Sequence, residues 1–137
     1  MSKIIMIIFL HILGDSVLLG QKLRKQKIDN IFYLFKHIGI YSLVFIIFTP
    51  VLLNISIITA LYYCLINAVL HFIVDFYFTK IKKIFWDKGD YKYVASFSIA
   101  EHVLHISILL TTYFIMFPGS IDIQSWYNDF IIHVLRS

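Results

Sequence analysis

The chain has 137 residues, of which 60% are hydrophobic and 15% are charged, and its mean hydropathy is +0.83. Soluble domains are about 45–50% apolar and about 25% charged, so this composition excludes an ordinary soluble domain and is typical of an integral membrane protein. The formal net charge is +4, and the single cysteine, Cys64, excludes an internal disulfide and a cysteine-built zinc site. The length suits one domain, residues 1–137.

Long apolar runs predict four membrane spans, since each crossing needs about 20 residues. We expect these spans at about 4–20, 31–53, 55–79 and 93–117. Pro50 is interpreted as marking the tight connection between the second and third spans, and Pro118 with Gly119 as the end of the fourth. Apolar residues at helical spacing then predict a short helix over about 122–135 that lies in the membrane interface. The predicted fold class is all-α, an integral membrane four-helix bundle with an up-down-up-down arrangement and a C-terminal interfacial helix.

The distribution of basic residues predicts the orientation of the bundle. Five of the twelve lie in or just beyond the first predicted loop and five lie in the loop before the last span: Lys22, Arg24, Lys25, Lys27, Lys36, Lys80, Lys82, Lys83, Lys88 and Lys92. The positive-inside rule puts both loops in the cytoplasm and both termini outside, as expected for a multi-pass protein of the bacterial inner membrane. Because these bases border spans and form no groove, nucleic acid is not an expected partner.

Ionisable residues inside the predicted spans point most directly to function. An acid near the bilayer centre costs about 2.5–3.5 kcal/mol, so such residues need partners. All four spans carry them: His11, Asp15, His37, His71, Asp75, Glu101, His102 and His105. With a helical rise of about 1.5 Å per residue, they fall into one layer in the cytoplasmic half of the membrane.

The spacing of these residues predicts a metal site. His11 and Asp15 are four residues apart, as are His71 and Asp75 and also Glu101 and His105, so each pair shares a helix face. Imidazoles and carboxylates together are the ligands of transition-metal sites. The predicted metal ligands are His11, Asp15, His37, His71, Asp75, His102 and His105. Glu101 is predicted to be a further ligand or the catalytic base that activates water. The surplus of candidates predicts two ions, or one ion with carboxylates that orient its imidazoles; zinc comes first, then manganese or iron.

These motifs resemble those of an uncharacterised family of small bacterial and phage membrane proteins. The resemblance covers roughly residues 5–110 and is carried by a His-Asp-Gln opening, a histidine in the second span, an H-x-x-x-D before a lysine, and an acid followed by histidine near the last span. The corresponding residues here are His11, Asp15, Gln21, His37, His71, Asp75, Lys80, Glu101, His102 and His105. The Glu101-His102 step departs from the family's acid-then-glutamine pattern. The family is similar to membrane-bound metal-dependent hydrolases, so the resemblance implies metal-dependent hydrolysis.

The expected function is therefore a membrane-embedded hydrolase that cleaves a phosphoester of a lipid or lipid-linked substrate at the cytoplasmic leaflet. The depth of the polar layer suits a lipid tail, and the surrounding bases suit a phosphate. Three alternatives stay open: a proton- or ion-coupled carrier, a di-iron membrane oxygenase, and a non-enzymatic holin-like or structural membrane protein. The sequence is also compatible with an oligomer.

Overall fold

All regular secondary structure in the described part of the chain is helical. The structure, a computed structural model, describes residues 3–17 and 30–118. Helix α1 (Lys3–Ile12) continues into a π-helical turn, η1 (Leu13–Val17). Three long helices follow: α3 (Ile31–Leu53), α4 (Ile57–Asp87) and α5 (Tyr91–Met116). The all-α prediction is thus confirmed for these residues, whereas the end of the first predicted span and the helix predicted over 122–135 lie outside them.

The long helices agree with three of the four predicted spans. The bounds of α3 match the prediction, and those of α5 differ from it by no more than two residues. Helix α4 continues to Asp87, beyond the predicted end at 79. All three are long and apolar enough to cross a membrane. Of the first predicted span the structure describes only residues 3–17, as α1 and η1.

Pro50 does not lie in the connection between α3 and α4, as the sequence had suggested, but inside α3. Helix α3 ends at Asn54, which adopts a left-handed conformation with φ 53° and donates its backbone N–H to the carbonyl of Pro50. Ser56 then caps α4, since its hydroxyl accepts from the N–H of Thr59 at 3.1 Å. The prediction was wrong here because a proline close to a helix end disturbs only the turn before it, and left-handed asparagine is the stronger stop.

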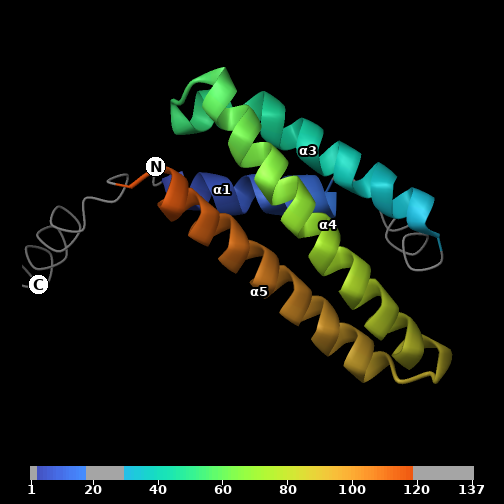
Figure 1. Cartoon of the computed structure of the whole chain (residues 1–137). Helices are drawn as coiled ribbons and strands as arrows, with labels where there is room; N and C mark the ends of the chain where they lie inside the picture. The colour runs from blue at the N-terminus through green and yellow to red at the C-terminus, as the bar shows by residue number, and fades with distance from the viewer. Residues whose placement is uncertain (1–2, 18–29, 119–137) are drawn as a thin grey trace, which may run out of the picture.

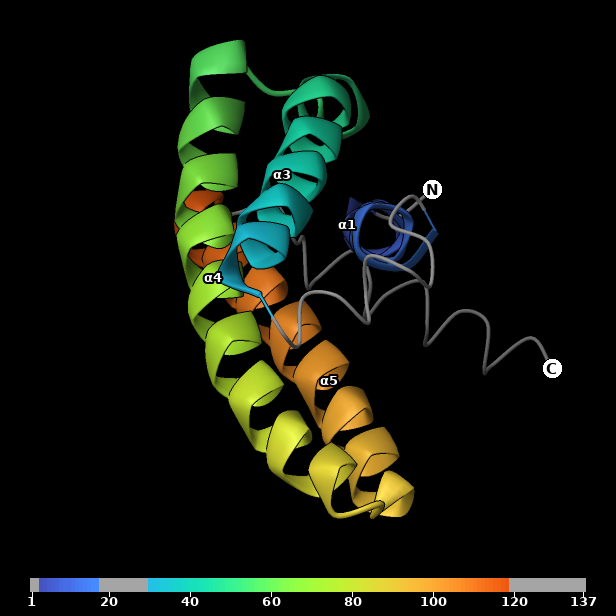
Figure 2. The same cartoon turned by 90° about the vertical axis from the view of Figure 1, so that its right-hand side faces the viewer.

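The helices form a closed bundle in which α4 contacts α3 and α5, and α1 contacts α3 and α5 from the other side (Figure 1). Helices α3, α4 and α5 alternate in direction, as predicted. Helix α1 crosses them. In Figure 2 it is seen end-on, whereas the other three helices run from the top toward the bottom of the picture. The closed end of the α4–α5 hairpin extends well past the start of α3 in both views.

The bundle is apolar outside and unusually polar inside. Large apolar side chains such as Val51 (79% exposed) and Ile115 (73% exposed) cover the long helices. The interior contains an apolar core, with Ile7, Leu10, Phe45 and Leu109 among its residues, and a set of buried His, Asp, Asn, Thr, Lys and Glu side chains. An apolar exterior of this extent suits a lipid environment, in which ionisable residues face the bundle interior.

Candidate metal centre

Seven of the eight predicted site residues meet in the bundle interior. They come from every helix of the described chain: His11 from α1, Asp15 from η1, His37 from α3, His71 and Asp75 from α4, and His102 and His105 from α5. We call these seven residues the His/Asp cluster. All of them are buried except His102, whose side chain is 36% exposed. Glu101, the eighth, makes a different contact.

A π-helical turn positions Asp15. It falls within η1, the turn that widens the end of α1, and such turns are frequent at functional sites. The preceding residue, Gly14, allows this turn to approach α3, because a Cβ there would lie 3.1 Å from Cδ2 of Tyr41. The four-residue spacing of His11 and Asp15 predicted a regular helix through both residues, and it gave no sign of the π-helical turn or of the close approach of Tyr41.

Four donor atoms converge at the centre of the cluster. The Nε2 atom of His37 lies 3.0 Å from Oδ1 of Asp15 and 3.0 Å from Oδ2 of Asp75. The Nε2 atom of His71 lies 3.6 Å and 3.7 Å from the same two oxygens. The two Nε2 atoms are 3.2 Å apart. We call these four atoms, from η1, α3 and α4, the first donor set.

The first donor set fits a small divalent cation. Zinc–nitrogen and zinc–oxygen bonds of about 2.0–2.2 Å in a tetrahedral site place neighbouring ligand atoms about 3.3–3.6 Å apart. Five of the six distances among the four atoms, all except the one between the two carboxylate oxygens, range from 3.0 to 3.7 Å and so bracket this value. Two groups of three donors each lie within 4.8 Å of one another: Asp15, His37 and His71, and His71, Asp75 and His105. Hydrogen bonds alone fit less well, because a neutral imidazole has only one N–H. The Nε2 atom of His37 faces two oxygens and a second nitrogen, and one proton can serve only one of them.

The remaining histidines face the other side of the two carboxylates. Oδ2 of Asp15 lies 2.9 Å from Nε2 of His102, and Oδ1 of Asp75 lies 3.6 Å from Nε2 of His105. The ring of His11 is centred 5.5 Å from that of His105 and 6.1 Å from that of His102. Within the described residues, no ring nitrogen of His11 or His105 has a hydrogen-bond partner. Buried polar atoms without one cost about 1–3 kcal/mol each, so the nitrogens of these two imidazoles could accept a ligand, and His105 belongs to a group with His71 and Asp75 that could hold a metal ion.

Two further side-chain contacts orient these imidazoles. Nδ1 of His102 lies 2.7 Å from the carbonyl oxygen of Ser98. Because a carbonyl only accepts, Nδ1 must carry the proton, and this contact directs Nε2 toward Asp15. The ring of Tyr41 stacks on that of His71 with centroids 4.1 Å apart. Both partners lie four residues from a predicted ligand, Ser98 before His102 and Tyr41 after His37, which is the one signal that the sequence offered for them.

Glu101 is held by a lysine. Its Oε2 accepts a hydrogen bond from Nζ of Lys82 at 2.5 Å, and both side chains are buried. Lys82 was expected at the cytoplasmic rim, but α4 brings it into the interior opposite α5. Glu101 is next to His102 in sequence and one turn before His105, so the ion pair is close to the cluster. Its predicted role as a catalytic base stays a prediction.

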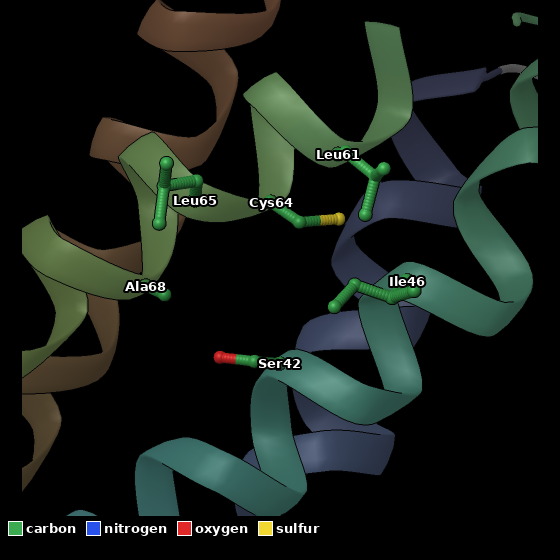
Figure 3. A pocket seen from close by; sticks show the side chains of 6 residues that line it. All are labelled: Ser42, Ile46, Leu61, Cys64, Leu65 and Ala68. Atoms are coloured by element: carbon green, nitrogen blue, oxygen red, sulfur yellow. The ribbon is translucent and has the colours of Figure 1, made fainter. Parts of the chain in front are cut away.

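An apolar pocket opens between α3 and α4 near the cluster (Figure 3). It has a volume of about 250 Å³ and is lined by Ser42, Ile46, Leu61, Cys64, Leu65 and Ala68. Ser42 follows Tyr41, and Ala68 lies less than one helical turn before His71. One end of the pocket therefore reaches the level of the His/Asp cluster.

The chain was compared with models of protein families, with curated proteins and with solved structures. No family model, curated protein or solved structure matched it. The assignment of a candidate metal centre therefore depends on the geometry of the seven side chains of the His/Asp cluster.

Proposed function

We propose that this protein is a membrane-embedded metal-dependent hydrolase. The observation that carries the proposal is the meeting of Asp15, His37, His71 and Asp75, as members of two neighbouring groups of donors, inside a bundle with an apolar exterior. A divalent ion held there, zinc in the first place, would supply Lewis-acid chemistry that stabilises negative charge on a substrate and makes water a better nucleophile. The protein's own side chains hold that ion and, through the apolar packing around it, limit the access of bulk water.

The proposed location is the inner membrane of a bacterium, with four crossings, the first starting with α1 and η1 and the others being α3, α4 and α5, and with both termini outside. The basic residues near the start of α3 and at the α4–α5 hairpin support this orientation. Because α4 extends beyond residue 79, Lys83 and Lys88 lie past the apolar part of the bundle. Trp86 and Tyr91 pack together at the same end, with ring centroids 5.2 Å apart, and such aromatic residues prefer the headgroup level.

The proposed substrate is a phosphoester of a lipid or a lipid-linked carrier. The pocket lined by Ser42, Leu61 and Ala68 is apolar and ends at the level of the cluster, so it suits part of an acyl or isoprenoid chain. The lysines of the hairpin favour a phosphate in the head group. The substrate would thus bring its phosphate to the cluster while its tail stays among apolar side chains.

The test is turnover by the protein purified in mild detergent. Mixed bacterial lipids incubated with the protein and zinc or manganese should release a phosphorylated or dephosphorylated head group, detected by mass spectrometry. Asp75→Asn should lower the rate by more than a hundredfold, whereas Asp87→Asn, an exposed acid at the end of α4, should leave it unchanged. Metal binding without turnover of any lipid would reject the hydrolase and leave the metal centre standing.

Glu101 needs its own test, because its ion pair with Lys82 and its position beside His102 allow two roles. If Glu101 acts as the base, Glu101→Gln should slow release more than tenfold and largely keep the metal. If Glu101 is a ligand, the same substitution should lower the metal content.

A proton- or ion-coupled carrier is the second candidate, and one observation favours it. The buried Lys82–Glu101 pair continues the row of ionisable groups from the cluster toward the α4–α5 hairpin, as in an intramembrane relay. In liposomes, a carrier would conduct protons or ions in a manner abolished by His71→Ala. Flux of this kind, together with no lipid turnover, would favour the carrier over the hydrolase.

A further inference from the structure

We propose that the His/Asp cluster holds two metal ions bridged by the carboxylates of Asp15 and Asp75. The first ion would be held by His37 and His71, and the second by His102 and His105 with His11 beside them. This inference rests on the metal centre proposed above and specifies it further. It is built from the directions of the two carboxylates, the stacking of two imidazoles, and the charge of the cluster.

The two oxygens of each carboxylate face different histidines. For Asp15, Oδ1 faces His37 and His71, whereas Oδ2 lies 2.9 Å from His102. For Asp75, Oδ2 faces the same two histidines, whereas Oδ1 lies 3.6 Å from His105. Both carboxylates therefore stand between two sets of nitrogen atoms. A carboxylate in this position can offer one oxygen to each of two ions.

The rings of His71 and His105 belong to the two different sets of nitrogen atoms. They stack in parallel, with centroids 3.8 Å apart and planes inclined by 11°. Their Nε2 atoms face the two different oxygens of Asp75. Stacked rings whose Nε2 atoms face different oxygens of one carboxylate could bind two ions separated by about the stacking distance. That separation matches the spacing of about 3.5–4 Å found in two-metal hydrolytic sites.

His11 lies beside the second set of donors. Its ring is near those of His102 and His105, its side chain is fully buried, and within the described residues neither of its nitrogens has a hydrogen-bond partner. A single ion in the first donor set would leave both nitrogens of this imidazole without a role. A second ion gives His11 and His105 a ligand function at one position.

The net charge of the cluster then indicates the chemical class of the substrate. With neutral imidazoles, Asp15 and Asp75 contribute two negative charges, which one divalent ion neutralises. Two divalent ions leave a net positive centre inside an apolar bundle, and such a centre needs an anion to complete it. A phosphoester suits this requirement better than a neutral ester or amide.

The alternative is one ion with His102 as a charged partner of Asp15. In that case Nδ1 of His102 donates to Ser98 and Nε2 donates to Asp15, and the second set of histidines orients the first donor set without binding metal. The two arrangements differ in the number of ions and in their magnetic coupling. Both properties can be measured without any substrate.

The experiment loads the full-length protein in mild detergent with Mn²⁺ and removes excess metal by gel filtration. Two ions per chain and an exchange-coupled electron paramagnetic resonance spectrum are expected. His102→Gln combined with His105→Gln should reduce the content to one ion with an uncoupled six-line spectrum. Asp87→Asn should keep both ions. Circular dichroism and elution volume show whether each variant is folded, and His102→Gln alone, at a half-buried position, provides a milder second variant.

One uncoupled Mn²⁺ per wild-type chain at saturation would overturn the two-ion assignment and leave the proposed metal centre intact. Two ions retained by the doubly substituted variant would also overturn it, because the second set would then not be the ligands. No bound metal with Mn²⁺, Zn²⁺ or Fe²⁺ would overturn this inference and the proposed hydrolase together.

Discussion

Helix α4 carries two buried polar regions that differ in their hydrogen bonding. Around Asn67, each donor has an acceptor within reach: its amide donates to the carbonyl of Tyr63 at 2.8 Å, and the Tyr63 hydroxyl donates to the carbonyl of Leu109 at 3.0 Å. The Thr112 hydroxyl lies 2.9 Å from the side-chain oxygen of Asn67 and 3.0 Å from the carbonyls of Ile108 and Leu109. One turn further along, His71 and Asp75 belong to a cluster in which nitrogen and oxygen atoms that can bind a cation meet: Nε2 of His71 lies 3.7 Å from Oδ2 of Asp75 and 3.2 Å from Nε2 of His37.

This difference in hydrogen bonding distinguishes a structural network, the one around Asn67, from a ligand site, the His/Asp cluster. The network around Asn67 satisfies itself and joins α4 to α5 without any addition. The His/Asp cluster brings acceptor atoms together at distances that suit a cation. Because burial and polarity are the same in both regions, neither property identifies a site by itself. The balance of donors and acceptors does.

The largest effect is expected from a variant that removes ligands of the His/Asp cluster and keeps the hydrogen bonds around Asn67. His71→Ala combined with Asp75→Ala removes donors from both donor sets, so metal content after gel filtration should fall more than tenfold. Asn67→Ala, one turn earlier on the same helix, should keep the metal. Elemental analysis of the three proteins measures the contrast, and equal metal content in all three would show that the cluster is not the site.

The Lys82–Glu101 pair offers an intermediate case, a buried region in which a protein charge faces a protein charge. Lys82→Met removes the ammonium group that contacts the buried carboxylate of Glu101 and should lower the free energy of unfolding by about 3–5 kcal/mol. Adding Glu101→Gln should recover much of this loss, because the carboxylate that lost this ion pair is then absent. Denaturation in detergent measures both variants, and a double variant as unstable as Lys82→Met would contradict the explanation.

The approach of η1 to α3 is tested by two glycine substitutions. In Gly14→Ala the new methyl group would lie 3.1 Å from the ring of Tyr41, which should cost about 1–3 kcal/mol of stability and weaken metal binding by displacing Asp15. Gly39→Ala is the matched control, since a Cβ there meets nothing within 4 Å. It should keep metal affinity and raise helix stability by up to about 1 kcal/mol. Metal titration and thermal unfolding report the two effects separately.

The smallest effect is expected in the Asn67 network. Thr112→Val removes the hydroxyl that donates to Asn67 while keeping the shape of the side chain. Hydrogen bonds between membrane helices average about 0.6 kcal/mol, so stability should fall by about this amount, with metal content unchanged. Loss of metal in this variant would mean that the network and the cluster act as one unit.

The sequence by itself determined the helices and the candidate ligands. Helix α3 and helix α5 follow from long apolar runs, and the residue types of the cluster follow from the cost of placing His11, Asp75 and similar residues among apolar neighbours. These properties are local, because hydropathy and four-residue spacing need only a few neighbouring residues.

The tertiary structure alone decided how those residues are paired. In the folded protein Glu101 pairs with Lys82, the two oxygens of Asp15 face different histidines, and Tyr41 lies against Gly14. Each of these contacts joins side chains from different elements, so it depends on the rotation and separation of packed helices, which the local spacing of residues leaves undetermined.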